Sequence, residues 1–122
     1  MSASKRKGTS WESAIVQFLR DNGVAHAERR ALAGNADRGD IAGIPGVVIE
    51  AKAEKAITLA AYVKETEAER INDGARHGIA WIKRVGKSSP ADAYVVMTGE
   101  GLMRLLADAG YVPYPVTEAG DA

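Results

Sequence analysis

The sequence predicts a single α/β domain in which a mixed β-sheet is flanked by helices. The expected order is helix, three strands, helix, two strands, helix, or α-β-β-β-α-β-β-α. Segments with apolar residues at helical spacing alternate with short runs rich in β-branched residues. At 122 residues the chain is long enough for one hydrophobic core and too short for two. Its 46% hydrophobic and 26% charged residues are typical of a folded globular protein.

The first helix is expected to begin at Thr9 or Ser10 and to end at Asn22 and Gly23. Its apolar residues recur at helical spacing and form one stripe, which consists of Trp11, Ala14, Ile15, Phe18 and Leu19. The chain then divides into a flexible basic arm, one domain and a tail, at residues 1–8, 9–115 and 116–122.

A strand is expected over residues 24–32, followed by a polar loop and then a hairpin. The hairpin combines residues 40–43 with residues 47–53, and its turn is centred on Pro45. The remaining elements are a helix at 59–72, strands at 79–85 and 93–98, and a final helix at 101–109.

Composition narrows the chemistry that the chain can support. There is no cysteine, so a metal ion would be held by oxygen ligands or by the two histidines, which favours a hard cation such as Mg²⁺. No apolar run is long enough to span a bilayer, so we expect a cytoplasmic protein without a membrane partner. The sixteen basic and sixteen acidic residues balance, but short basic clusters permit a phosphate-binding face.

The hairpin carries the candidate chemistry. Asp40 and Glu50 are equally far from Pro45, so they are expected to face each other, with Cβ atoms about 5 Å apart. Lys52 shares a strand face with Glu50 because side chains alternate along a strand. Two carboxylates can hold Mg²⁺, which activates water for phosphodiester hydrolysis, and the lysine can position or deprotonate that water.

The segments Gly39-Asp40-Ile41 and Glu50-Ala51-Lys52 together resemble the D…(D/E)xK signature of the restriction-endonuclease-like nucleases. Residues 6–12, Arg-Lys-Gly-Thr-Ser-Trp-Glu, resemble the opening of the archaeal-type and phage Holliday junction resolvases of that superfamily. Gly39 stands where many members of the superfamily have proline.

The resemblance implies a restriction-endonuclease-like fold and cleavage of branched DNA, such as four-way junctions, by a homodimer that uses Mg²⁺ or Mn²⁺. It implies that Asp40, Glu50, the backbone carbonyl of Ala51 and Glu12 bind the metal, and that Lys52 assists the attacking water. The candidate DNA-contacting residues are Lys5, Arg6, Lys7, Thr9, Arg29 and Arg30.

Each candidate also has a plainer interpretation. Glu12 follows Thr9 by three positions, so it is equally consistent with a capping box at the helix start. Glu50 and Lys52 are also consistent with the solvated face of a strand, and Asp37 is an alternative to Asp40 with a poorer register.

Other chemistry-bearing residues are interpreted as structural. His26 and His77 have no recognisable partner in the sequence and are assigned no catalytic role. Trp11 and Trp81 lie among apolar neighbours and are expected in the core.

Three functions remain open from the sequence. The first is a junction-resolving endonuclease, the second is another structure-specific nuclease or nickase of the same fold, and the third is a DNA-binding module without activity.

Overall fold

The computed structural model describes residues 3–30 and 38–113, with side chains from residue 8 onward. Within them, the helices and strands follow the predicted order, which confirms the α/β class with a mixed sheet. The elements are α1 (Ala3–Asp21), β1 (Glu28–Arg29), β2 (Ile41–Ala42), β3 (Val47–Lys52), α2 (Leu59–Asp73), β4 (His77–Ile82), the 3₁₀ turn η1 (Pro90–Asp92), β5 (Tyr94–Val96) and α3 (Gly99–Asp108).

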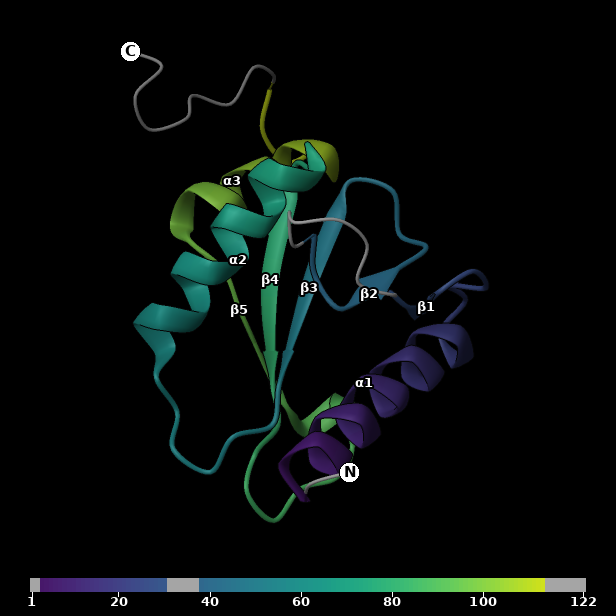
Figure 1. Ribbon diagram of the computed structural model, residues 1–122. Helices are drawn as coiled ribbons and strands as arrows, with labels where there is room; N and C mark the ends of the chain where they lie inside the picture. Colours follow the sequence, from purple (N-terminus) through teal and green to yellow (C-terminus); the bar gives the residue numbers. More distant parts are fainter. Residues whose placement is uncertain (1–2, 31–37, 114–122) are drawn as a thin grey trace.

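The five strands form one sheet in the order β1-β2-β3-β4-β5 (Figure 1). β3 and β4 are parallel, and the other neighbouring pairs are antiparallel. The parallel pair requires a crossover, which α2 supplies between the two strands. β3 and β4 therefore form the centre of the sheet, and their carboxyl ends lie at the same edge.

Helix α1 begins at Ala3 and not at Thr9, so the flexible arm predicted at residues 1–8 is wrong for residues 3–8. The segment before Thr9 contains alanine, lysine and arginine, which favour helix, and its one glycine costs only about 1 kcal/mol inside a helix. The predicted tail, residues 116–122, lies outside the described residues.

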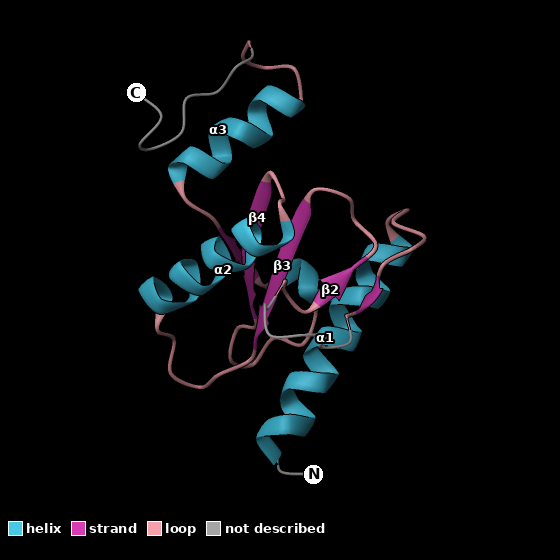
Figure 2. Cartoon of the chain, turned by 45° about the horizontal axis from the view of Figure 1, so that its top comes forward, coloured by secondary structure: helices cyan, strands magenta, loops and turns pink. Residues whose placement is uncertain are grey.

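The core lies mainly between α1 and the sheet. Trp11 and Trp81 are buried, as predicted, and the indole Nε1 of Trp11 donates a hydrogen bond to the carbonyl oxygen of Trp81 at 3.0 Å. The main buried cluster consists of Trp11, Ile15, Val16, Ala27, Ile41, Ile49 and Trp81. A second, smaller buried cluster consists of Tyr62 of α2 with Ala80 and Ile82 of β4. Figure 2 shows α2 crossing the sheet on the side away from α1.

Several boundaries differ from the prediction. The strand expected at residues 24–32 is reduced to Glu28–Arg29, because Asn22 to Ala27 form turns after α1. β4 is earlier than expected and ends at Ile82, since the chain turns between Arg84 and Lys87. No helix among the described residues has the length and apolar character that crossing a membrane would need.

Candidate active site

The candidate site lies along the edge of β3 that β2 leaves open. The β2–β3 ladder ends with the pairing of Ile41 and Ile49, whereas β3 continues to Lys52. Beyond the ladder, the backbone N–H of Ala51 donates to Oδ2 of Asp40 at 2.8 Å. A carboxylate therefore replaces a neighbouring strand at this edge, and it is held beside Glu50.

The strand register agrees with the sequence prediction. Asp40 and Glu50 are each one residue farther from the turn than the Ile41–Ile49 pair. The backbone N–H of Asp40 donates to the carbonyl oxygen of Ile49 at 2.9 Å, which fixes the approach of the two segments. Asp37, the alternative to Asp40, lies outside the described residues.

Gly39 stands where many nucleases of the superfamily that the motif resembles have proline. The backbone conformation at this position explains the difference. Its φ angle is 94°, whereas proline is restricted to about −65°. A Cβ atom at Gly39 would also lie 2.8 Å from Cγ1 of Val48. In this chain, the turn into Asp40 therefore requires glycine.

Glu50 and Lys52 project toward α2, on the same face of β3, as predicted. The ammonium Nζ of Lys52 lies 3.3 Å from Oε1 of Glu50 and 2.8 Å from Oε2 of Glu65. It also lies 5.2 Å from the ring centroid of Tyr62. Glu50 is only 5% exposed, so it does not lie on a solvated strand face.

Helix α2 supplies two carboxylates that the site prediction did not include, Glu65 and Glu69. One carboxylate oxygen from each, together with one from Glu50, forms a group whose atoms all lie within 4.8 Å of one another. A signal in the sequence could have found Glu69. It follows Tyr62 and Thr66 at helical spacing, on the face of α2 that is buried, where an acidic residue is unusual.

The pKa of Glu50 is raised far above its ordinary value. Burial is the largest cause, followed by the hydrogen bond and charge of Glu69 and by the charge of Asp40. Lys52 lowers the pKa but does not offset these effects. Ionised Glu50 therefore needs a further cation beside it, because two adjacent buried carboxylates repel each other.

Lys52 remains a cation in this environment. Burial lowers its pKa, but the hydrogen bond to Glu65 and the charge of Glu50 raise it more, and the net pKa lies above the ordinary value for lysine. Of the two roles considered for Lys52, positioning through its charge is therefore favoured over deprotonation of water.

Glu12 reaches the site from α1. It lies well inside the helix, which begins at Ala3, so the capping-box interpretation of Glu12 is wrong. Burial raises its pKa, and the charge of Asp40 raises it further, which places the two carboxylates near each other. Arg29 Nε lies 3.5 Å from Oε1 of Glu12 and lowers that pKa.

The predicted DNA-contacting residues are dispersed. The side chain of Arg29 is 48% exposed and pairs with Glu12. The side chain of Arg30 is largely buried, and its Nη1 lies 3.8 Å from Oδ1 of Asp73. Thr9 lies within α1. The side chains of Lys5, Arg6 and Lys7 lie outside the described residues.

The two histidines differ in their surroundings. His26 is exposed, whereas His77 is buried in β4. The sequence showed no partner for His77, but its Nε2 contacts Oδ2 of Asp108 at the end of α3. This contact links α3 to β4, away from the acidic edge of β3.

The donor set fits a hard divalent cation. Carboxylate oxygens are the ligands that Mg²⁺ and Mn²⁺ prefer. Oε2 of Glu50 is buried and receives no hydrogen bond from any described donor. Asp40 and Glu12 do not join the compact group of Glu50, Glu65 and Glu69, and the metal-binding roles of Asp40, Glu12 and the Ala51 carbonyl stay predictions.

Comparison with known proteins gives no assignment. The chain matches no family model, no curated protein and no solved structure. The interpretation of the site therefore depends on its own geometry and on the motif in the sequence.

Proposed function

We propose that this protein is a metal-dependent endonuclease that hydrolyses phosphodiester bonds in branched DNA, as a Holliday junction resolvase does. The observation that carries the proposal is the arrangement at the open edge of β3. There Asp40 accepts a hydrogen bond from Ala51 N–H, Glu50 lies one step outside the last strand pair, and Lys52 contacts Glu50 at 3.3 Å. Glu12 is close enough for the charge of Asp40 to shift its pKa.

The proposed fold is that of the restriction-endonuclease-like nucleases. The order α-β-β-β-α-β-β-α and the mixed sheet with a central parallel pair support this assignment. In the structure, Asp40 directly precedes β2, and Glu50 and Lys52 share β3, the next strand along the chain.

The residues have separate roles in the proposed reaction. Bound Mg²⁺ or Mn²⁺ would neutralise charge on the phosphate and lower the pKa of a water molecule. Asp40 and Glu50 hold the cation at the strand edge, and Glu65 and Glu69 are further carboxylates within reach of Glu50. Lys52 keeps its proton and offers a positive charge to the phosphate. Glu12 adds a carboxylate to the acidic site from the α1 side.

The protein is proposed to act as a homodimer, because resolving a four-way junction requires cuts in two symmetry-related strands. Helix α3 supports a second copy, since it buries Arg104 and leaves Leu102, Met103 and Leu105 more than two-fifths exposed. This is the reverse of the usual pattern on a surface helix, so a partner is expected to cover the apolar side.

The test is a cleavage assay on a labelled synthetic four-way junction, with a linear duplex of the same arm sequence as the competing substrate. Wild-type protein is expected to cut the junction in Mg²⁺, to cut it in two paired strands, and to stop in a chelator. Asp40→Asn and Glu50→Gln are expected to lose cleavage while they still bind the junction in Ca²⁺.

The matched control is Glu28→Gln, which removes the same charge from an exposed position on β1. It should cleave like the wild type. Equal cleavage of junction and duplex would instead support a general nuclease or nickase. Binding without any cleavage in Mg²⁺ or Mn²⁺ would support a non-catalytic module, and a fully active Glu50→Gln protein would overturn the site.

A further inference from the structure

A basic hollow lies at the carboxyl ends of the parallel strands β3 and β4. Its volume is about 160 Å³, and its lining comes from the two segments that follow these strands. The segments are held together because the N–H of Lys83 donates to the carbonyl oxygen of Lys52 at 2.9 Å. The residues that line it are Ala53, Glu54, Lys55, Lys83, Arg84, Val85 and Gly86.

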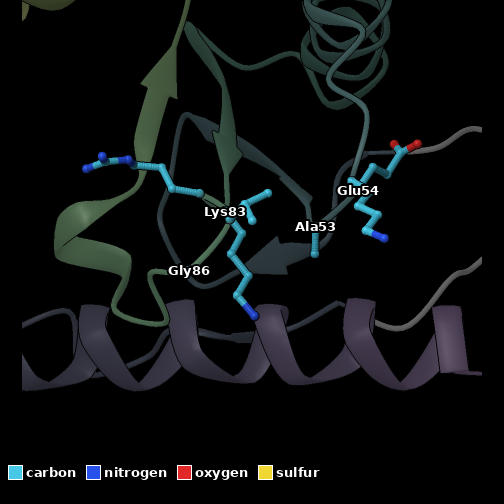
Figure 3. Close-up of a pocket in the computed structure, with 7 residues that line it drawn as sticks. Ala53, Glu54, Lys83 and Gly86 are labelled. Atoms are coloured by element: carbon cyan, nitrogen blue, oxygen red, sulfur yellow. The ribbon is translucent and has the colours of Figure 1, made fainter.

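The charge of the hollow is not compensated by neighbouring acids. Seven basic side chains elsewhere in the described structure contact a carboxylate, namely Arg29, Arg30, Arg38, Lys52, Arg70, Arg76 and Arg104. Lys55, Lys83 and Arg84 form no ion pair with any described residue. Glu54 is the one acid in the lining, and Figure 3 shows its carboxylate turned away from Lys83.

Two of the three cations are directed by the fold. Lys83 lies just after β4, two residues beyond Trp81 of the α1-facing core, and extends toward α1 in Figure 3. The guanidinium of Arg84 lies 5.1 Å from the ring centroid of Tyr94, and its Nη1 donates to the carbonyl oxygen of Asp92 at 3.2 Å. A guanidinium that is already ordered loses less entropy when it binds an anion.

The turn at the rim of the hollow lets a ligand approach the backbone closely. The N–H of Lys87 donates to the carbonyl oxygen of Arg84 at 3.1 Å, and Gly86 takes a φ of 80° within this turn. No atom lies near the position that a Cβ of Gly86 would occupy, so backbone is exposed to the hollow there.

We propose that this hollow binds a backbone phosphate of the DNA substrate, next to the phosphate that is cut. The hollow is smaller than the roughly 300 Å³ at which pockets for drug-sized ligands begin, so it fits a single phosphate group better than a whole nucleotide. The lining has three cationic side chains and one acidic side chain, so the hollow favours an anion. Crevices at the carboxyl ends of parallel strands are also common ligand sites.

The inference rests on the proposed function for its link to cleavage. Lys52 directly precedes Ala53 and the hollow, so a DNA strand whose reactive phosphate lies at Glu50 would continue across Lys55 and Lys83. Phosphate contacts fix the position of a nucleic acid without reading its sequence. The hollow would thus hold the strand in register for the acidic edge.

The experiment measures the affinity for the four-way junction in Ca²⁺, where binding is scored without cleavage, over a series of salt concentrations. The main variant is Lys55→Gln/Lys83→Gln, because neither side chain forms an ion pair that the structure describes. The magnitude of the slope of log affinity against log salt concentration is expected to fall by about one, because the hollow contacts one phosphate.

The matched control is Lys64→Gln, an exposed lysine on α2 that forms no ion pair with any described residue. Its slope should stay within a few tenths of the wild-type value. Arg84→Gln, with its folding checked by circular dichroism, should lower the affinity for the junction and should lower the slope by less than the double variant does. An unchanged slope in the double variant, or an equal fall in Lys64→Gln, overturns the phosphate site.

The outcomes separate this inference from the proposed function. If the wild type cleaves junctions and the double variant keeps the wild-type slope, the proposed nuclease activity stands and the proposed phosphate site is wrong. If the wild type binds junctions, the double variant shows the expected slope change and no cleavage occurs, the phosphate site stands and the proposed nuclease activity is wrong. If the wild type binds no DNA, both proposals are wrong.

Discussion

Replacing Glu50 with glutamine is expected to increase the free energy of unfolding of the metal-free protein. Burial, together with Glu69 and Asp40, raises the pKa of Glu50 well above its ordinary value of 4.5. Above pH 4.5 the carboxyl group of Glu50 releases its proton in the unfolded chain, whereas it keeps the proton in the folded chain. The folded state therefore loses stability as pH rises. Glutamine has nearly the same shape and does not ionise, so the loss disappears.

The size of the effect follows from the pH interval. Each pH unit between 4.5 and the working pH costs the wild type about 1.4 kcal/mol, as long as folded Glu50 stays protonated, which gives about 3 kcal/mol at pH 7. Part of this gain is offset because an amide replaces the carboxyl group 3.3 Å from Nζ of Lys52, although Lys52 keeps its contact with Glu65. A net increase of about 1–3 kcal/mol is expected, or roughly 3–10 °C in Tm.

The assay is urea and thermal unfolding in a chelator at several pH values from 4.5 to 8, with Glu28→Gln as the control. The advantage of Glu50→Gln should be small near pH 4.5 and should grow toward pH 7. Added Mg²⁺ should raise the Tm of the wild type and not that of Glu50→Gln. A variant that is less stable than the wild type at pH 7, or a difference that does not change with pH, would refute this reasoning.

Two further predictions concern single residues. Lys52 keeps its proton because its pKa is raised, so Lys52→Arg should retain measurable junction cleavage while Lys52→Met loses at least about a hundredfold in rate; equal losses in single-turnover assays would contradict a role through charge. Gly39→Ala should lower the free energy of unfolding by about 1–3 kcal/mol in urea titrations, because φ at this position is 94° and Val48 leaves no room. Gly8→Ala, at an open position within α1, should be neutral or stabilising by up to about 1 kcal/mol, and an equal loss at both glycines would argue against strain at Gly39.

Much of the fold could be predicted because its signals are local. The apolar stripe of α1, the β-branched run of β3 and the turn at Pro45 each depend on neighbours in the sequence. The hairpin register followed from the same turn, and the observed pairing of Ile41 with Ile49 agrees with it. The start of α1 could not be located, since residues 3–8 favour helix about as well as a basic arm.

The site was predicted only along one strand pair. Asp40, Glu50 and Lys52 are separated by a short turn, so strand alternation was enough to bring them together. Glu65 and Glu69 approach Glu50 only because α2 crosses over β3 and β4. Arg29 and Arg30, which the sequence made candidates for DNA contact, lie within ion-pair distance of Glu12 and Asp73, and no local pattern indicated these contacts.

The sequence by itself determined the order of the elements, the register of the hairpin and the shared face of Glu50 and Lys52, because these depend on period, turn position and local propensity. The tertiary structure alone decided that Glu50 is buried beside Glu69 and that Glu12 lies inside a helix near Asp40. It also decided that Lys55, Lys83 and Arg84, which form no ion pair with any described residue, line one hollow at the ends of β3 and β4. Burial and long-range electrostatics depend on which distant segments pack together, and no local pattern in the chain encodes that choice.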